Sequence, residues 1–199
     1  VTGSVIKGPL SNSLVGLDYN NDGNITGAEP EVRTDADGNY TLPTNNSNYT
    51  VIATTDDTTV DTFSGAVLSG VTLKSPQEAK FVTPTTTLMV EANLSADQVA
   101  SVLGLPDGVD PLIFNPYDAD ADVANALAVE KSSYQIINVL TALSSAVEGA
   151  GASQTNAFMH ALDSVVTVVK IKAANLNNPD ASNADKSLDL TSDSDLALI

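Results

Sequence analysis

The chain has 199 residues, 42% of them hydrophobic and 17% charged, so it is too apolar for a disordered chain and long enough to bury a core. Its 25 acidic residues outnumber 8 basic ones, and the resulting formal net charge of −17 argues against nucleic acid and anionic lipid as partners. There is no cysteine, which excludes a disulfide framework and a thiolate nucleophile.

Residues 1–80 alternate short β-branched runs with clusters of Gly, Asn, Asp and Pro. This pattern predicts short antiparallel strands separated by tight turns. The expected strands are Gly3–Lys7, Leu14–Tyr19, Glu31–Thr34, Tyr40–Pro43, Thr50–Thr54 and Phe63–Leu73. Several short strands at this spacing favour a small antiparallel β-sandwich.

Residues 81–199 have the pattern of helices. Thr83 and Pro84 are expected to start a helix over Thr85–Asn93, and Ser95 to cap a helix over Ala96–Leu103 that ends at Gly104. Longer helices are predicted over Ala121–Glu148 and Ser153–Ala174, although the β-branched run Val165–Val169 leaves a strand as an alternative. The apolar positions at helical spacing are Val123, Leu127, Tyr134, Ile137, Leu140 and Val147 in the first, and Phe158, Leu162, Val165 and Val169 in the second, where Lys172 continues the same spacing.

These two patterns predict an α+β fold with a sandwich over residues 1–80 and a small helical bundle over residues 81–199. No Gly-, Ser- or Pro-rich linker separates them, so we expect them to pack as one module. No apolar run approaches the roughly 20 residues of a membrane-spanning helix, which predicts no membrane insertion. The chain starts abruptly at Val1, without a signal peptide, and stops in Leu196–Ile199 as a helix-like pattern begins, which predicts an excised piece of a longer protein. We expect this piece to be monomeric.

The strongest chemical signal is the twelve-residue segment Asp18–Glu29, which matches the pattern of a calcium-binding loop position by position. Calcium prefers six to eight oxygen ligands, and this spacing wraps oxygen-bearing residues around one point. Gly23 permits the sharp turn at position six, and Ile25 at position eight anchors the loop to a core. The predicted ligands are Asp18, Asn20, Asp22, Asn24 through its carbonyl, and Glu29, with Thr26 as a further candidate.

The flanks of this loop differ from those of a helix-loop-helix sensor. A strand-like run, Leu14–Leu17, precedes the loop, and Pro30 follows it and forbids a simple helical exit. We therefore expect a fixed structural ion between two strands. The alternative is an Asp-, Asn- and Gly-rich hairpin without metal.

Two further acidic clusters are weaker candidates. Asp35 and Asp37 could complete the first site or form another, but they also fit a hairpin turn with solvated carboxylates. Asp118, Asp120 and Asp122 precede the long helix, where capping and the helix dipole favour aspartate without a metal.

The N-terminal residues resemble a known family. The segments Val5–Leu10, Val15–Asp18, Asp22-Gly23 with Glu29-Pro30, and Thr34–Leu42 are similar to the B-type repeats of bacterial surface adhesins. That resemblance implies a prealbumin- or immunoglobulin-like antiparallel β-sandwich that often holds calcium in this loop. Further along, the segments Phe63–Gly65, Val82–Leu88, Leu103–Pro106 and Phe114–Pro116 resemble a segment of large secreted RTX-type adhesins.

The same resemblance raises one covalent possibility. Some B-type repeats form an isopeptide bond between a lysine of the first strand and an asparagine, and Lys7 has the position of such a lysine. No asparagine partner is evident on Tyr49–Thr54, so we expect Lys7 to be solvated instead.

No catalytic motif is visible. The only histidine, His160, lies in an apolar helical segment, and there is no phosphate-binding loop, zinc motif or nucleophile elbow. The expected function is therefore a non-enzymatic, calcium-stabilised structural or adhesive module at the bacterial cell surface, in contact with neighbouring domains of its own chain. The alternative is a calcium-dependent module that binds a peptide or glycan.

Overall fold

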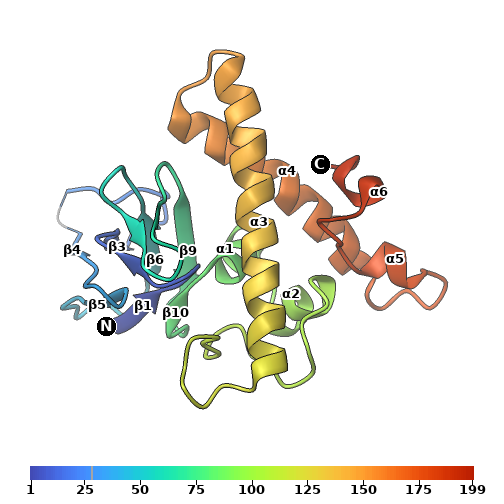
Figure 1. The fold of residues 1–199 in the computed structure, drawn as a ribbon, viewed down its shortest axis with the longest axis horizontal. Coiled ribbons are helices and arrows are strands. Elements are labelled where there is room, and N and C mark those ends of the chain that lie inside the picture. Colours follow the sequence, from blue (N-terminus) through green and yellow to red (C-terminus); the bar gives the residue numbers. More distant parts are fainter. Residues whose placement is uncertain (28) are drawn as a thin grey trace. The chain divides into compact units, whose positions relative to one another are not determined.

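The computed structural model describes residues 1–27 and 29–199, and its chain divides into two compact units, Val1–Thr87 and Leu88–Ile199 (Figure 1). The first unit contains the β-strands and the second is helical, so the α+β class is confirmed. The expected division at residue 80 is a few residues early. Phe81–Val82 forms a strand, β10, that pairs with the first strand of the chain and belongs to the first unit.

The main sheet of the first unit is antiparallel and has the order β4-β3-β6-β9. Its strands are Glu31–Arg33 (β4), Leu14–Asp18 (β3), Thr50–Thr54 (β6) and Thr72–Pro76 (β9). Every residue of β3 from Val15 to Asp18 is buried, as is the run Val51–Ala53 of β6. Since successive side chains of a strand point to opposite faces, both faces of this sheet are covered.

Two smaller sheets complete the unit. One has the order β10-β1-β5, in which Thr2–Val5 (β1) pairs parallel with β10 and antiparallel with Asn39–Thr41 (β5). The other joins Leu10–Ser11 (β2), Val60–Asp61 (β7) and Ala66–Val67 (β8).

The predicted strand Phe63–Leu73 is wrong as a single element. Gly65 and Gly70 both adopt positive φ, at 74° and 73°, and break the segment into a turn, the short strand β8 and the start of β9. Glycine adopts this conformation without steric cost, which suits these two bends.

The predicted helix starts agree with the structure within one residue, except that the long helix begins at Val123, two residues after the predicted Ala121. Each start has a local capping residue. Thr83 Oγ1 accepts a hydrogen bond from Thr86 N ahead of Pro84–Ala92 (α1), and Ser95 forms a capping box with Gln98 at the start of Ala96–Val102 (α2). Asp122 caps Val123–Gly149 (α3), and Ser153 caps Gln154–Asn175 (α4).

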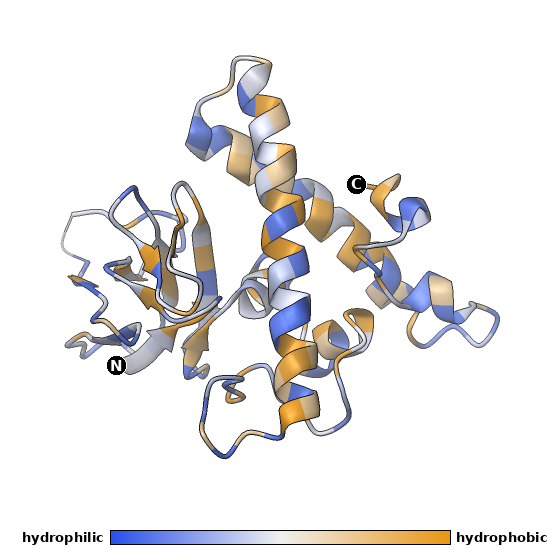
Figure 2. Ribbon diagram, in the orientation of Figure 1, coloured by the Kyte–Doolittle hydropathy of each residue, from blue (hydrophilic) through white to orange (hydrophobic). Residues whose placement is uncertain are grey.

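The helical unit is built around α3 and α4, which pack against each other and are joined by a turn at Gly151 with φ of 105°. The β-branched run of α4 is helical throughout, and its apolar face is buried; Figure 2 shows apolar and polar residues alternating along this helix. In α3, however, only the middle of the predicted face is buried, and Val147 near its end is half-buried. Ile137 and Leu140 lie in the core, whereas Val123 and Leu127 are 81% and 64% exposed.

Two short helices, Asn183–Lys186 (α5) and Asp193–Leu196 (α6), end the described chain. Both are tied to α4 through Lys172, whose Nζ forms a buried ion pair with Asp195 of α6 at 2.7 Å and donates a hydrogen bond to the backbone oxygen of Ala184 in α5. Lys172, which continues the apolar spacing of α4, therefore has an electrostatic partner inside this unit. Within residues 1–27 and 29–199, no helix combines the length and apolar character needed to cross a membrane.

Candidate metal centre

The Asp18–Glu29 segment connects two antiparallel strands, as expected. Asp18 is the last residue of β3, and β4 begins at Glu31. The entry and exit are held together by a hydrogen bond from Leu17 N to Pro30 O at 3.2 Å. The segment is thus a hairpin connection whose two ends are fixed by the main sheet.

Strand register determines which way Asp18 points. Gly16 pairs with Ile52, and Ile52 with Lys74, so these three residues form one row on one face of the sheet. Asp18 lies two residues after Gly16 on β3 and therefore faces the same side. It is 1% exposed, although it ends a strand at the edge of a polar loop.

The loop folds back over this same face. A Cβ at Gly16 would lie 2.6–2.8 Å from three side-chain atoms of Ile25, so the missing side chain leaves room for Ile25 against the sheet. A Cβ at Gly23 would lie 3.3 Å from Nζ of Lys74, which brings the Lys74 side chain up to the turn of the loop. The expected role of Ile25 as the anchor of the loop agrees with this packing.

Asp18 has one satisfied and one unsatisfied oxygen. Its Oδ2 accepts a hydrogen bond from Gly23 N at 2.9 Å, across the sharp turn at φ of 82°. Its Oδ1 is buried and has no hydrogen-bond partner among the described residues. Leaving a buried polar oxygen unsatisfied costs about 1–3 kcal/mol, and more for a charged group, so this atom is a position at which a cation would be stabilising.

Glu29 closes the loop from its other end. Its Oε1 accepts a hydrogen bond from Tyr19 N at 2.8 Å, and its Oε2 accepts one from Thr26 N at 2.7 Å. These bonds hold the carboxylate across the loop, between its second and ninth positions. Because each carboxylate oxygen has two lone pairs, one accepted hydrogen bond still leaves capacity for a metal.

Asn20, Asp22 and Asn24 make a short series of polar turns on the outer side of the loop. Asp22 N donates to Asn20 Oδ1 at 3.0 Å, and Asn24 N donates to Asp22 Oδ1 at 2.8 Å. Hydrogen bonds from the Asn20 side chain and the Asn24 backbone lower the pKa of the Asp22 carboxyl below its usual value. Asp22 thus stays ionised to lower pH than a free aspartate, which favours a nearby cation.

All five predicted ligands lie in this one loop, but its acidic side chains do not converge on a single point. Within the described part of the chain, no group of three acidic, histidine or cysteine side chains is arranged to hold a metal ion. The observation that fits calcium is instead the orphaned oxygen of Asp18, in a loop otherwise rich in hard oxygen ligands.

The second acidic turn lies away from this loop. Thr34 N donates to Ser13 O, so Asp35 lies beside the beginning of β3. Asp18 is at the other end of that strand, roughly 13 Å away at about 3.3 Å per residue. Asp35 Oδ1 accepts the backbone N–H groups of Asp37 and Asn39, and the Asn39 bond is the main reason for its lowered pKa. The structure thus favours the hairpin turn and does not bring Asp35 or Asp37 to the loop.

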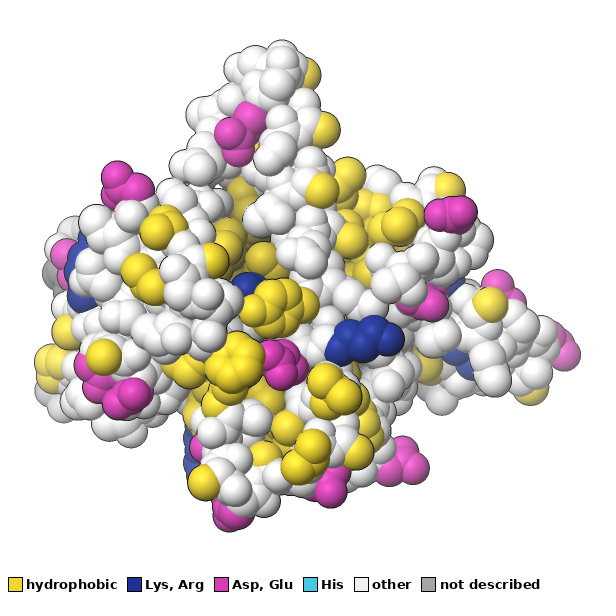
Figure 3. Space-filling view, viewed as in Figure 1, with side chains coloured by type: hydrophobic (Ala, Val, Ile, Leu, Met, Phe, Trp, Pro, Cys, Tyr) yellow, Lys and Arg dark blue, Asp and Glu magenta, His cyan; other side chains and the backbone are white. Residues whose placement is uncertain are grey.

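In the third cluster, Asp122 caps a helix and Asp118 bonds to a side chain of the preceding loop. Asp122 Oδ1 accepts Asn125 N at 3.0 Å at the start of α3, and Asp118 Oδ1 accepts Asn115 Nδ2 at 2.7 Å. Asp120 is exposed. On the face shown in Figure 3, acidic side chains are scattered and do not form one patch.

The prediction that Lys7 is solvated is wrong. It is buried, and its Nζ lies 2.9 Å from Oδ2 of Asp61, which is itself 1% exposed. Asp61 Oδ1 also accepts the N–H groups of Phe63 and Ser64, and a Cβ at Gly8 would collide with this oxygen. No signal in the sequence links two residues 54 positions apart, and we assign this pair a structural role.

Comparison with known proteins gives no further guidance. No protein-family model matches the chain, and neither a curated protein nor a solved structure shows significant similarity to it. The resemblance to adhesin repeats therefore stays a prediction that rests on the sequence segments named above.

Proposed function

We propose that this chain is a calcium-stabilised, non-catalytic structural module of a secreted bacterial surface adhesin, with a prealbumin-like sandwich as its first unit. Calcium would be held by Asp18, Asn20, Asp22, Glu29 and the carbonyl of Asn24, with Thr26 contributing directly or through water. The observation that carries the proposal is the buried, unpartnered Oδ1 of Asp18. The adhesin-like segments and the net charge of −17, which bound cations would partly neutralise, support the setting.

The role of the ion follows from where the loop lies. The turn around Gly23 and the side chain of Ile25 cover the Gly16 and Lys74 face of the main sheet. An ion that joins Asp18 on the sheet to Glu29 at the loop exit would fasten this cover over the sheet. It would act as a structural link that resists unfolding and proteolysis, without a chemical step.

Thermal unfolding in calcium and in chelator tests this proposal. At a calcium concentration about 100-fold above Kd, ligand linkage adds roughly 2.7 kcal/mol to the free energy of unfolding. We expect a clear rise in Tm in calcium relative to EGTA, and a much smaller rise in magnesium, which demands a smaller octahedral shell. Equal Tm values in calcium and EGTA would contradict the proposal.

Gly16→Ala tests whether loop packing supports the ion. The added Cβ would displace Ile25, whose β-branched side chain has few alternative rotamers, so the loop backbone must shift. Overpacking of this kind costs about 1–3 kcal/mol, and we expect calcium affinity, measured by isothermal titration, to fall about tenfold.

Gly149→Ala is the matched control, because a Cβ at this helical position meets nothing within 4 Å. Its calcium affinity should equal that of the unmodified chain. If Gly16→Ala also left the affinity unchanged, packing of Ile25 on the sheet would have no part in ion binding.

A further inference from the structure

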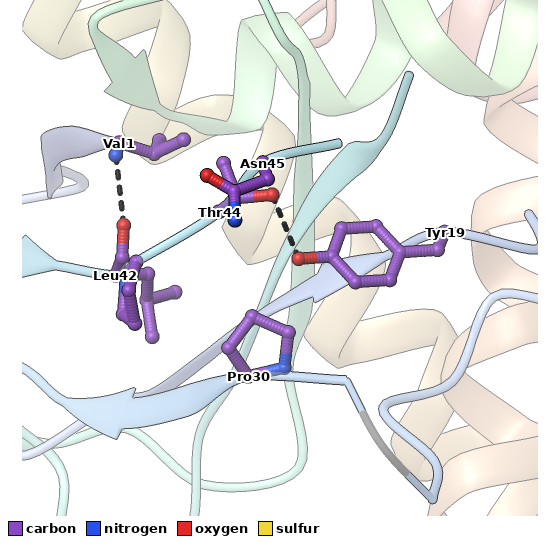
Figure 4. A pocket seen from close by; sticks show the side chains of 7 residues that line it. Val1, Tyr19, Pro30, Leu42, Thr44 and Asn45 are labelled. Atoms are coloured by element: carbon purple, nitrogen blue, oxygen red, sulfur yellow. Dashed lines mark hydrogen bonds between the residues drawn. The ribbon is translucent and has the colours of Figure 1, made fainter. Parts of the chain in front are cut away.

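A surface cavity of about 550 Å³ adjoins the Asp18–Glu29 loop within the first unit (Figure 4). Tyr19, the second residue of the loop, and Pro30, directly after its last residue, contribute to its wall. The segment after β5 supplies the remainder through Leu42, Pro43, Thr44 and Asn45, and Val1 also lines it. Its volume lies within the range of small-molecule sites, about 300–1,000 Å³.

The chemistry of the lining is neutral and mixed. Tyr19, Pro30 and Pro43 supply flat apolar surfaces, and Thr44 and Asn45 supply a hydroxyl and an amide. Of the described residues around this cavity, none has a charged side chain. Flat apolar surfaces beside hydroxyl and amide groups fit a ligand with C–H faces and many hydroxyls. No described side chain of the lining would neutralise a charged ligand, and the Val1 amine is already hydrogen-bonded to Leu42 O at 2.8 Å.

The position of Tyr19 is fixed from both of its ends. Its hydroxyl is hydrogen-bonded to Thr44 Oγ1 at 2.8 Å, and Figure 4 shows the ring extending toward Thr44. Its backbone N–H donates to Oε1 of Glu29. The residue that would close the calcium shell therefore also holds one wall of the cavity, and Pro30 follows it in the chain.

We propose that this cavity, defined by Tyr19, Pro30, Pro43, Thr44 and Asn45, binds a neutral carbohydrate, and that calcium in the adjoining loop strengthens binding. The calcium dependence rests on the proposed function. With Glu29 held by the ion, Tyr19 and Pro30 are already ordered before the ligand arrives, so binding costs less conformational entropy. The Asn45 amide donates to and accepts from sugar hydroxyls, while the Thr44 hydroxyl, already bonded to Tyr19 and Asn46, holds the wall in place. The rings of Tyr19 and Pro43 pack against sugar C–H groups.

The full chain is screened on an array of neutral mono- and oligosaccharides in calcium, and hits are titrated in solution in calcium and in EGTA. We expect a saccharide whose affinity falls about tenfold in EGTA and about tenfold in Asn45→Ala, the size of one lost hydrogen bond with its desolvation. Asn48→Ala is the control, because Asn48 is exposed on the same segment but does not line the cavity.

The calcium-dependent Tm shift of each variant separates the two proposals. An unchanged shift in Asn45→Ala, together with lost saccharide binding, supports the carbohydrate site. A calcium-dependent Tm without any saccharide hit, or a hit only on peptides, overturns this inference and leaves the calcium proposal intact. Equal saccharide affinity in calcium and in EGTA would show that calcium does not strengthen binding. Equal saccharide affinity of Asn45→Ala and the unmodified chain would show that the saccharide does not bind in this cavity.

Discussion

Asp18→Asn is expected to lower stability in calcium and to raise it in EGTA. In calcium the substitution removes a charged ligand whose Oδ1 has no other partner, so the gain of roughly 2.7 kcal/mol from an ion present at about 100 times its Kd is lost. In EGTA the same position holds a buried, unsatisfied carboxylate oxygen. A neutral amide is less costly to bury there, and its oxygen can still accept the hydrogen bond from Gly23 N.

This reversal of sign distinguishes a metal ligand from an ordinary structural aspartate. A carboxylate needed only for its hydrogen bond to Gly23 would make the asparagine variant neutral or destabilised in both solutions. Urea unfolding of both proteins, in calcium and in EGTA, gives the four free energies required. Asp57→Asn, an exposed position in the same unit, removes the same charge and should show no reversal.

The sequence predicted the features that depend on nearby residues. Ser95 and Ser153 each lie one residue before a helix and accept a hydrogen bond from a backbone N–H within the first turn, so the helix starts could be identified from short segments. The calcium-loop spacing is equally local, and its placement between strands followed from Leu14–Leu17 and Pro30. For the same reason Ile25 could be recognised as an anchor, although its contact at Gly16 could not.

The features that were missed depend on long-range pairing. The strands β2, β7 and β10 have two residues each, too short for an alternating pattern, and they form only because distant partners are aligned with them. Lys74 reaches Gly23 only through the register of β9 with β6. Val123 and Leu127 continue the apolar spacing of α3 but lie beyond the part of the helix that is buried.

Lys7→Met is expected to destabilise the first unit strongly. Lys7 and Asp61 are both buried and 2.9 Å apart, so removing the lysine leaves the Asp61 carboxylate without this cationic partner in the interior. Breaking a buried ion pair in this way typically costs about 3–5 kcal/mol. The exposed pair of Arg33 and Asp56 is the control, and Arg33→Met should change the free energy of unfolding far less, because solvent screens that pair.

The effect of Lys7→Met on the free energy of unfolding should also depend on pH, through the buried carboxyl of Asp61. Burial alone would raise the pKa of Asp61, but hydrogen bonds from Lys7 and Ser64 and the charge of Lys7 outweigh it and lower the pKa below its usual value. A carboxyl with a lowered pKa in the folded state contributes stability above the unfolded pKa, near 4, and loses it as the pH falls through the folded pKa. In Lys7→Met the Asp61 carboxylate loses the cation that stabilises its charge, so protonation removes an unfavourable buried charge. The difference in free energy of unfolding between this variant and the unmodified chain should therefore narrow toward pH 4.

Adding Asp61→Asn to Lys7→Met should recover part of the lost stability. The amide keeps an oxygen for the N–H groups of Phe63 and Ser64 but carries no charge that needs a partner. Urea unfolding of the two single variants and the double variant gives the coupling between the positions. If the double variant were no more stable than Lys7→Met alone, the cost of losing the lysine would lie in its packing, and the buried charge of Asp61 would not be the cause.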